Sequence, residues 1–504
     1  MLDFGGQYAH LICRRVRALG VYAALLPHET KYSELRAMGV AGVILSGGPA
    51  SVYSDGAPSV DPEIFRGELP LLGICYGYQL IVRANGGEVT RAGLREYGRT
   101  SVTVQAGGGL LDGMEGGRFD CWMSHSDSAT KIPETMEVLA SSDSSPYAAV
   151  RLAGGSQYGV QFHPEVSHTQ NGQAVLSNFV VGICRAERKW NMKEFLDESV
   201  TTLSRLEGDV LCAVSGGVDS SVTAVMLNRA VGRGLRCVFI DTGLLRQGEG
   251  GRVRRLLGQE LGVRVETVDA SDLFMKALAG VSDPEEKRRV VGKTFADVFE
   301  EFARKNGPFR HLAQGTLYPD VIESGRSNGP ASVIKTHHNV GGLPRDLSMS
   351  VVEPLRELYK DEVRELGYLL GLPKAVVERH PFPGPGLAVR VVGEVTEEKL
   401  RICRDASEIV EEQLRKEGLY QNVWQAFAYV GDDEVTGVLG DERRLGRQVT
   451  VKVIESVDAM TADWSRLDFE VLKRISSRIT NEVAGVVAVS YAISSKPPAT
   501  IEPQ

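Results

Sequence analysis

The 504-residue sequence lacks the features that mark membrane-bound, secreted or nucleic-acid-binding proteins. It has no run of about 18 apolar residues, so no segment is expected to cross a bilayer and no membrane partner is expected. The first residues, MLDFGGQ, contain neither a basic nor an apolar leader region, which argues against a signal peptide. An excess of basic residues is also missing. The 57 Lys and Arg against 65 Asp and Glu leave a net charge of −8, which argues against nucleic acid as the main partner.

Closely spaced cysteines are absent too. The seven cysteines are scattered at positions 13, 75, 121, 184, 212, 237 and 403, an odd count without zinc-knuckle or CxxC spacing. Reduced thiols in a cytoplasmic protein are the simplest interpretation. No internal repeat, low-complexity tract or organic prosthetic group is expected.

The length suggests about three domains of roughly 150 residues each. We predict an α/β protein with two parallel-sheet domains, at 1–186 and 187–379, followed by an α+β domain at 380–504. Short apolar runs that end in polar or glycine turns predict the parallel strands, and PFPGPG at 381–386 breaks any helix or central strand. Strands are expected at 40–45, 69–74, 210–214, 238–241 and 263–268, a helical connector at 188–196, and helices at 396–417 and 467–483.

The most specific motif is SGGVDSS at 215–221, between a predicted strand and a predicted helix that begins at Ser220. Its backbone N–H groups and the helix N-terminus can bind an anion, although a glycine turn can also serve only close packing. The loop lacks the GK[ST] ending of a Walker A motif. It resembles the pyrophosphate loop of the N-type ATP pyrophosphatases. That resemblance implies cleavage of ATP to AMP and PPi, with ATP bound by Ser215, Gly216, Gly217, Val218, Asp219, Ser220 and Ser221.

A second motif places Cys75 between Gly73 and Gly77, directly after an apolar strand. Such glycines permit the strained strand-to-helix turn of a nucleophile elbow, where a thiol becomes reactive. Far along the chain, His163 and Glu165 are two residues apart on a predicted strand, so their side chains would share one face. His163 could take the thiol proton while Glu165 orients the ring.

Each of these pieces alone has a plain alternative, a core cysteine or a surface turn. Together they resemble the class I glutamine amidotransferases, whose GxCxGxQ elbow and HPE strand match here over residues 2–185. The resemblance implies a Cys75–His163–Glu165 triad. Gly47 and Gly48 match the family's glycine-rich loop, so Gly48 and Tyr76 are expected to form the oxyanion hole.

The whole chain resembles the family that joins these two activities and aminates XMP to GMP. This implies that glutamine, ATP and XMP are the substrates, that ATP adenylates XMP at O2, and that the C-terminal domain forms a homodimer. The family's lid segment implies Mg²⁺ ligands at Asp320 and Glu323, together with Asp219, and we expect the first two in a loop. Lys335 would neutralise phosphate charge, whereas adjacent His337 and His338 point to opposite sides and make a poor zinc pair. XMP contacts are expected from Gln425, Lys496, Thr500 and Glu502.

The sequence departs from this family in two places. It begins almost inside its first strand, and the usual Ile-Glu-Trp-Glu ending reads Ile501-Glu502-Pro503-Gln504. Because Glu502 is kept, we expect XMP binding to survive.

Three alternatives stay open at this point. An NAD synthetase uses the same pyrophosphate loop but a nitrilase-type ammonia source, which lacks the GICYG and HPE motifs. A tRNA-thiolating enzyme would need paired catalytic cysteines near the loop and a basic face. A non-catalytic scaffold would not need Cys75, His163 and Glu165.

Overall fold

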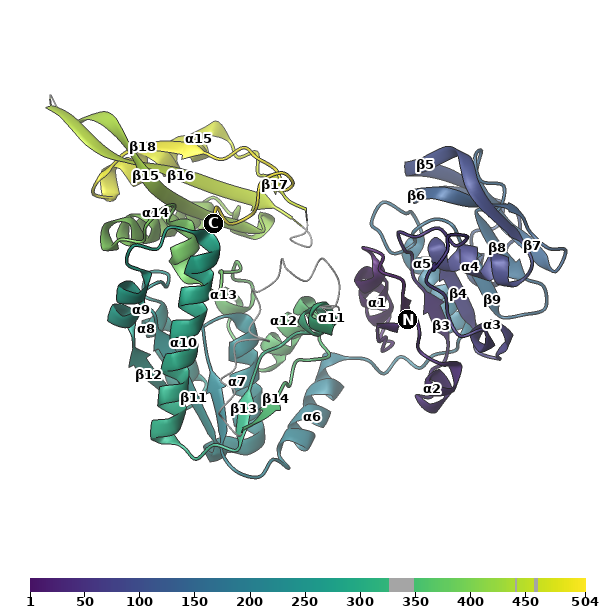
Figure 1. The fold of residues 1–504 in the computed structure, drawn as a ribbon, viewed down its shortest axis with the longest axis horizontal. Coiled ribbons are helices and arrows are strands. Elements are labelled where there is room, and N and C mark those ends of the chain that lie inside the picture. Colours follow the sequence, from purple (N-terminus) through teal and green to yellow (C-terminus); the bar gives the residue numbers. More distant parts are fainter. Residues whose placement is uncertain (326–348, 440–441, 457–460) are drawn as a thin grey trace. The chain divides into compact units, whose positions relative to one another are not determined.

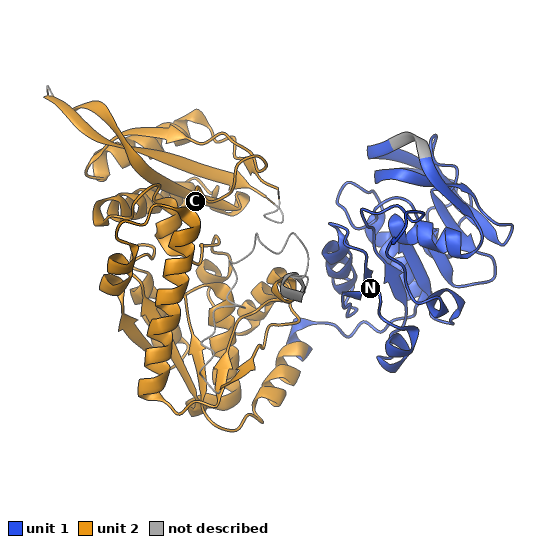
Figure 2. Cartoon of the chain, viewed as in Figure 1, with its two compact units in different colours: residues 1–194 blue, residues 195–504 orange. Residues whose placement is uncertain are grey.

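The structure, a computed structural model, describes residues 1–325, 349–439, 442–456 and 461–504, with the side chains at 92–95, 322–325 and 439 outside that description. Its chain forms two compact units, unit 1 at residues 1–194 and unit 2 at residues 195–504 (Figure 2). Over these ranges no helix has both the length and the apolar character that a membrane span requires.

Unit 1 is built on a nine-stranded mixed sheet with the order β2-β1-β3-β4-β9-β8-β7-β5-β6 (Figure 1). The first five strands in this order are parallel, and the rest form an antiparallel extension. Their bounds are β1 Leu2–Asp3, β2 Leu26–Pro27, β3 Val43–Leu45, β4 Leu71–Ile74, β5 Glu88–Val104, β6 Arg118–Lys131, β7 Met136–Ser141, β8 Ala149–Leu152 and β9 Gln157–Val160. The helices of the unit are α1 Ala9–Arg17, α2 Tyr32–Ala37, α3 Glu63–Arg66, α4 Tyr76–Ala84 and α5 Gly172–Ser177, followed by a π-helical turn at Asn178–Ile183.

The central strands of unit 1 are buried on both faces, as continuous apolar runs in a parallel sheet require. Ile44 and Leu72 belong to one core cluster, whereas Val43, Leu45 and Leu71 belong to another. This alternation follows from the two-residue period of a strand. The sheet therefore carries a separate apolar layer on each face.

The predicted helical connector at 188–196 is only partly helical. Residues 187–191 have no regular secondary structure, and α6 (Met192–Leu203) begins later than expected. The Trp190 N–H donates to the Gly20 carbonyl at 2.8 Å, and the Trp190 ring lies 4.9 Å from both the Tyr22 ring and the Arg17 guanidinium. These tertiary contacts fix Trp190 against the end of α1 and favour a non-helical segment. Asn191 Oδ1 then accepts from Glu194 N at 2.9 Å and caps α6.

Unit 2 contains a five-stranded parallel sheet with the order β12-β11-β10-β13-β14. The strands are β10 Val210–Ala213, β11 Leu235–Asp241, β12 Val265–Asp269, β13 His311–Ala313 and β14 Ser350–Val352. Sequence order reverses at β10, the kind of switch point where α/β sheets bind ligands. The associated helices are α7 Val218–Val231, α8 Glu249–Val253, α9 Ser271–Leu278, α10 Pro284–Asn306, α11 Tyr318–Gly325, α12 Lys360–Leu369 and α13 Lys374–Val377.

The C-terminal part of unit 2 is a mixed four-stranded sheet packed on helices. Its elements are α14 Glu397–Lys416, β15 Gln425–Leu439, β16 Glu442–Glu455, β17 Asp463–Trp464, α15 Phe469–Glu482 and β18 Val486–Tyr491. One buried core runs from Val238 and Ile240 of β11 through Phe299 of α10 to Ile409 of α14 and Val451 of β16. In Figure 1, α14 lies between the C-terminal sheet and the rest of the unit. The predicted fold class, two parallel-sheet regions and an α+β region, is confirmed.

Candidate functional site

Cys75 occupies a strained turn between β4 and α4. Its φ of 52° and ψ of −104° lie where residues with a side chain are uncommon, and such strain concentrates at functional sites. The flanking glycines are required by contact: a Cβ at position 73 would lie 2.4 Å from the Gly77 carbonyl oxygen, and one at position 77 would lie 2.4 Å from that of Leu45. The predicted elbow geometry is present, with Cys75 at the start of a helix.

His163 and Glu165 form a buried pair beside this turn. His163 Nδ1 lies 2.7 Å from Glu165 Oε1, and the two residues are 5% and 0% exposed. Burial opposes protonation of the ring, but the Glu165 charge and a hydrogen bond with Cys75 outweigh it, so the pKa of His163 is raised well above its usual value. Glu165 therefore favours the imidazolium form.

The expectation that His163 and Glu165 lie on a strand was wrong. Strand β9 ends at Val160, and residues 161–165 form a turn. Tertiary hydrogen bonds hold this turn: His163 N donates to the Trp122 carbonyl at 3.0 Å, and the Thr169 hydroxyl donates to the His163 carbonyl at 2.6 Å. The two side chains meet because of this turn.

Gly47 and Gly48 bring a glycine loop against the same residues. A Cβ at position 47 would lie 3.2 Å from His163 Cε1 and 3.7 Å from Cys75 Cβ. One at position 48 would lie 3.4 Å from Tyr76 Cγ. Tyr76 is the first residue of α4, so its N–H has no acceptor within the helix. The structure thus groups Cys75, His163, Glu165, Gly48 and Tyr76.

The motif at 215–221 lies between β10 and α7, as predicted, but α7 begins two residues before the expected Ser220, so residues 218–221 form its first turn. Gly216 has a φ of +80°, and α7 begins at Val218, so the loop ends in a helix N-terminus. Hydroxyls shape it: Ser215 N donates to Ser220 Oγ at 3.2 Å, and Gly217 N approaches Ser215 Oγ at 3.4 Å. The Ser221 hydroxyl is buried and makes no hydrogen bond to the described residues.

Lys360 is the residue at this loop that the sequence analysis missed. Its Nζ donates to both carboxylate oxygens of Asp219, at 2.7 and 2.6 Å, and lies at the start of α12. It comes 141 residues after Asp219, and LYKDE at 358–362 resembles any polar helix start, so no sequence signal pointed to it. Lys335, the cation expected here, lies outside the described residues.

Asp320 and Glu323 are on α11, so the expected loop is a helix. Asp320 Oδ2 accepts from Leu317 N at 3.1 Å, which caps the start of this helix despite the neighbouring Pro319. The Glu323 side chain lies outside the described residues. Within the described part of the chain, no group of three or more His, Cys, Asp or Glu residues could hold a metal ion by itself.

The C-terminal tail meets the start of β15, which also contacts the first residue of the Pro/Gly segment at 381–386. Gln425 Nε2 donates to Glu502 Oε1 at 2.8 Å and to the Pro381 carbonyl at 3.1 Å. Arg390, which is 1% exposed, binds Glu502 through two bonds of 3.0 Å. Thr500 accepts from Lys452 through its carbonyl at 2.6 Å. Gln425, Thr500 and Glu502 are thus brought together.

Lys496 lies apart from this group along the tail. Its backbone pairs with that of Ala462 through bonds of 2.7 and 3.1 Å. Arg390 was not predicted, because an arginine nine residues after Pro381 gives no sequence signal of a partner at 502. At the tail's end, Gln504 contacts Lys287 and Arg288 of α10, so the atypical ending is also anchored.

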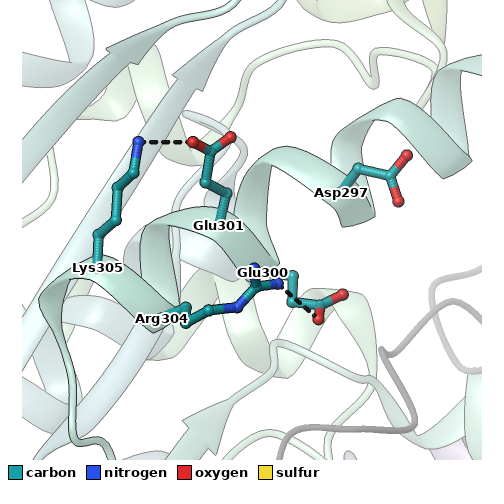
Figure 3. A pocket seen from close by; sticks show the side chains of 5 residues that line it. All are labelled: Asp297, Glu300, Glu301, Arg304 and Lys305. Carbon is teal, nitrogen blue, oxygen red and sulfur yellow. Dashed lines mark hydrogen bonds and ion pairs between the residues drawn. The ribbon is translucent and has the colours of Figure 1, made fainter.

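Hollows on the described surface of unit 2 include the following two. One of about 680 Å³ borders Gly216 and Ser221 of the loop and extends past α8 toward Tyr420. The other, about 350 Å³, lies along the last turns of α10 and is lined only by ionic side chains (Figure 3). Its Arg304–Glu300 and Lys305–Glu301 pairs are ordinary one-turn helix pairs at 3.1 and 2.5 Å. Of these two hollows, the first adjoins a predicted site and the second does not.

Comparison with known proteins identifies both ends of the chain. Residues 1–183 match the class I glutamine amidotransferase family, and residues 412–503 match the GMP synthase C-terminal domain family. A glutamine-hydrolysing GMP synthase from Pyrobaculum aerophilum is 52% identical over 100% of this chain and 99% of its own length. Proteins of the same name from Carboxydothermus hydrogenoformans and a Synechocystis species are 49% and 50% identical over 100% of this chain and 98% and 94% of theirs. The chain therefore belongs to the glutamine-hydrolysing GMP synthase family.

Proposed function

We propose that this chain aminates XMP to GMP, with ammonia from glutamine and energy from ATP, which leaves as AMP and PPi. The observation that carries this proposal is the joint presence of the Cys75–His163–Glu165 group and the SGGVDSS loop in a chain about half identical to GMP synthases along its full length. Glutamine-dependent GMP formation is the reaction of that family.

Glutamine is hydrolysed in unit 1. Cys75 Sγ attacks the side-chain amide carbon, and His163 takes the thiol proton and passes it to the departing nitrogen, which leaves as ammonia. The N–H groups of Gly48 and Tyr76 stabilise the oxyanion. Water then cleaves the thioester and releases glutamate. Glu165, 2.7 Å from His163 Nδ1, holds the ring with Nε2 toward the thiol and stabilises its positive charge.

XMP is activated in unit 2. XMP O2 attacks the α-phosphorus of ATP and pyrophosphate departs; ammonia then adds at C2 and AMP departs. The N–H groups of residues 215–221 and the N-terminus of α7 hold the pyrophosphate. Lys360, bound to Asp219 in this structure, supplies a cation at the same place. Lys335 is proposed to add a second cation.

Mg²⁺ is proposed to accompany ATP. The donor chemistry fits, because carboxylate oxygens are the protein ligands that Mg²⁺ prefers and most of its coordination then comes from phosphate and water. Asp219, whose side chain is 30% exposed, and Asp320 would hold it, with Glu323 as a further ligand. The ion would neutralise charge on the departing pyrophosphate.

XMP is proposed to bind where the tail meets β15. Gln425 and Glu502 offer an amide and a carboxylate to the base or ribose, and Thr500 lies two residues from Glu502. Lys496 is proposed to reach the XMP phosphate. Because Arg390 and Gln425 already bind Glu502, this carboxylate is fixed before the nucleotide arrives, which lowers the entropy cost of binding.

The competing activities fit the structure less well. Cys212 and Cys237, the cysteines nearest the loop, are directly opposite on β10 and β11 and are 1% and 0% exposed. Such buried thiols suit packing and not tRNA thiolation. None of the seven cysteines, all of them among the described residues, forms a disulfide, which supports our proposal of a cytoplasmic location.

Homodimerisation is proposed for the C-terminal sheet. β15 pairs with β16 on one side, and among the described residues its other edge carries only the Val391–Val430 bridge. Val438 and Leu445, on the long β15–β16 hairpin (Figure 1), are each 71% exposed. An open edge and exposed apolar side chains favour association with a second copy.

A coupled assay tests the proposal. The full chain is supplied with XMP, ATP, Mg²⁺ and either glutamine or ammonium, and GMP, AMP and PPi are measured together. Equal amounts of the three products are expected from both nitrogen sources. Stoichiometric ADP and orthophosphate would contradict adenylation of XMP.

A further inference from the structure

A largely buried ion pair contacts the pyrophosphate loop at Gly216. Arg379 Nη1 and Nη2 donate to Glu249 Oε1 and Oε2 at 2.5 and 2.6 Å, a two-bond contact between side chains that are 17% and 6% exposed. Glu249 begins α8, and Arg379 follows α13 by two residues. The pair therefore joins segments that are 130 residues apart in the sequence.

One end of the pair supports Gly216. A Cβ at position 216 would lie 2.7 Å from Glu249 Oε1 and 2.7 Å from Val253 Cγ2, so the loop backbone rests on this carboxylate. A bare carboxylate this close to a polyphosphate-binding loop would repel the ligand. Arg379 neutralises the charge of the Glu249 carboxylate and fixes the position of that carboxylate. The pair therefore sets both the backbone shape of the loop and the electrostatic potential at it.

The other end leads to the proposed XMP pocket. Arg379 adjoins His380, whose ring stacks on Tyr420 at 3.7 Å. Arg246, three residues before Glu249, donates to the carbonyls of His380 at 3.0 Å and Pro381 at 3.3 Å. The Pro381 carbonyl also accepts from Gln425, which binds Glu502. A continuous set of contacts thus runs from Gly216 to Glu502.

We propose that the Glu249–Arg379 pair is a positioning pair that couples the two nucleotide sites, so that ATP and XMP each bind more tightly when the other is present. The inference rests on the proposed function, since it needs XMP at Gln425 and Glu502. Neither side chain touches the reacting atoms. Both act through the backbone of Gly216 and of residues 380–381.

Calorimetry on the full chain tests this coupling. XMP binding is titrated with and without α,β-methylene-ATP and Mg²⁺, and the ratio of the two dissociation constants is the coupling factor. A factor of about ten is expected for the unmodified protein, within the usual range for coupled sites. It should fall toward one in Arg379→Lys, which keeps the charge but loses the two-bond geometry.

Two further variants complete the experiment. Glu249→Gln with Arg379→Gln in the same chain removes both charges, so no charge is left buried alone, and it should also lose the coupling while keeping XMP binding without ATP. Arg252→Lys is the matched control, because Arg252 is 49% exposed and lies 3.8 Å from the same carboxylate; its coupling factor should be unchanged. An unchanged factor in the Arg379 variants, or an equal loss in the control, overturns the pair's role. Absence of XMP binding in the unmodified protein overturns the proposed function itself.

Discussion

At the scale of single residues, glycines decide whether Cys75 can act. Gly77→Ala places a Cβ 2.4 Å from the Leu45 carbonyl oxygen, a backbone atom that cannot move without shifting β3. We expect Gly77→Ala to lower the free energy of unfolding by roughly 2–4 kcal/mol, since overpacked backbone contacts are among the larger mutational effects. We also expect it to remove most of the glutaminase activity. Thermal unfolding and glutamate release measure the two effects.

Gly182→Ala is the matched control for this change, because a Cβ there meets nothing within 4 Å. It should leave both activity and stability close to those of the unmodified protein. If the two alanine variants behave alike, close packing at the elbow is not what Gly77 provides.

His380 gives the second residue-scale prediction, a pH dependence of stability. Burial lowers the pKa of His380 to about 4, below its ordinary 6.5, and its Nε2 lies 2.8 Å from the Tyr420 carbonyl. As the pH falls, His380 therefore takes up a proton in the unfolded chain before it does so in the folded protein. The contribution of neutral, buried His380 to the free energy of unfolding is complete above about pH 6.5 and is lost progressively toward pH 4. Between pH 6.5 and pH 5 the free energy of unfolding falls by about 2 kcal/mol, since each pH unit in this range costs about 1.4 kcal/mol.

His380→Gln replaces the ring N–H donor by an amide N–H donor and removes the titration. Denaturant unfolding at several pH values should show a shallower fall in stability for the variant than for the unmodified protein. Parallel curves would mean that His380 is not the group responsible.

The residues that were predicted and those that were missed differ in their sequence context. Cys75, His163 and Glu165 stand in short motifs whose local pattern predicts the chemistry that we propose for them. Lys360 and Arg390 act through partners 141 and 112 residues away and stand in ordinary helix and loop sequence. Contacts made only by tertiary folding leave no local pattern, so the sequence could not reveal them.

At the scale of elements, long periodic segments were predicted well and short polar ones were not. The helix expected at 396–417 is α14 at Glu397–Lys416, with Thr396 capping Lys399 N. The turn at 161–165 and the non-helical linker at 187–191 were predicted wrongly, because hydrogen bonds to distant backbone atoms override local propensity there. Pro319 suggested a loop, yet proline is tolerated in a helix's first turn, and α11 begins at Tyr318.

The C-terminal tail is the element whose role is most easily tested. Glu502→Gln replaces a carboxylate held by Arg390 and Gln425, and we expect XMP binding to weaken about ten- to a hundredfold, the cost of losing charge-assisted contacts. Deleting residues 496–504 should abolish synthesis from either nitrogen source.

Two further measurements test whether the tail acts at the XMP site alone. ATP binding in the absence of XMP should be unchanged in Glu502→Gln. The 215–221 loop follows β10 of the five-stranded parallel sheet, whereas Glu502 meets β15 of the four-stranded C-terminal sheet. Glutamine hydrolysis at Cys75 should persist after the deletion. XMP affinity that survives the deletion would remove the tail from the site.

At the scale of the whole molecule, the second and third predicted domains share one core. The break at 381–386 suggested a boundary, but Leu387, Ala388 and Val391 directly after it join the core that contains β11 and β16. A proline- and glycine-rich segment indicates where helices and strands end, and it does not indicate whether the flanking regions pack together. The arrangement within unit 2 therefore could not be predicted from the sequence.

Assembly is the molecule-scale property that solution measurement can settle. Light scattering at micromolar concentration should give a dimer of the 54.7 kDa chain. Charged substitutions at Val438 and Leu445, both 71% exposed, should shift the protein toward the monomer without unfolding it. A fully active monomer would contradict the proposal that the C-terminal sheet forms the interface.

The central claim is a division of labour between two sites, and one comparison tests it most directly. GMP formation by Cys75→Ala is measured with saturating glutamine and with saturating ammonium, each relative to the unmodified protein. We propose that only Cys75 forms the glutamyl thioester, so the glutamine-dependent rate should vanish. The ammonium-dependent rate should stay within about twofold, because a substitution in unit 1 leaves every residue of unit 2 unchanged. Loss of both rates, or retention of both, would contradict the account.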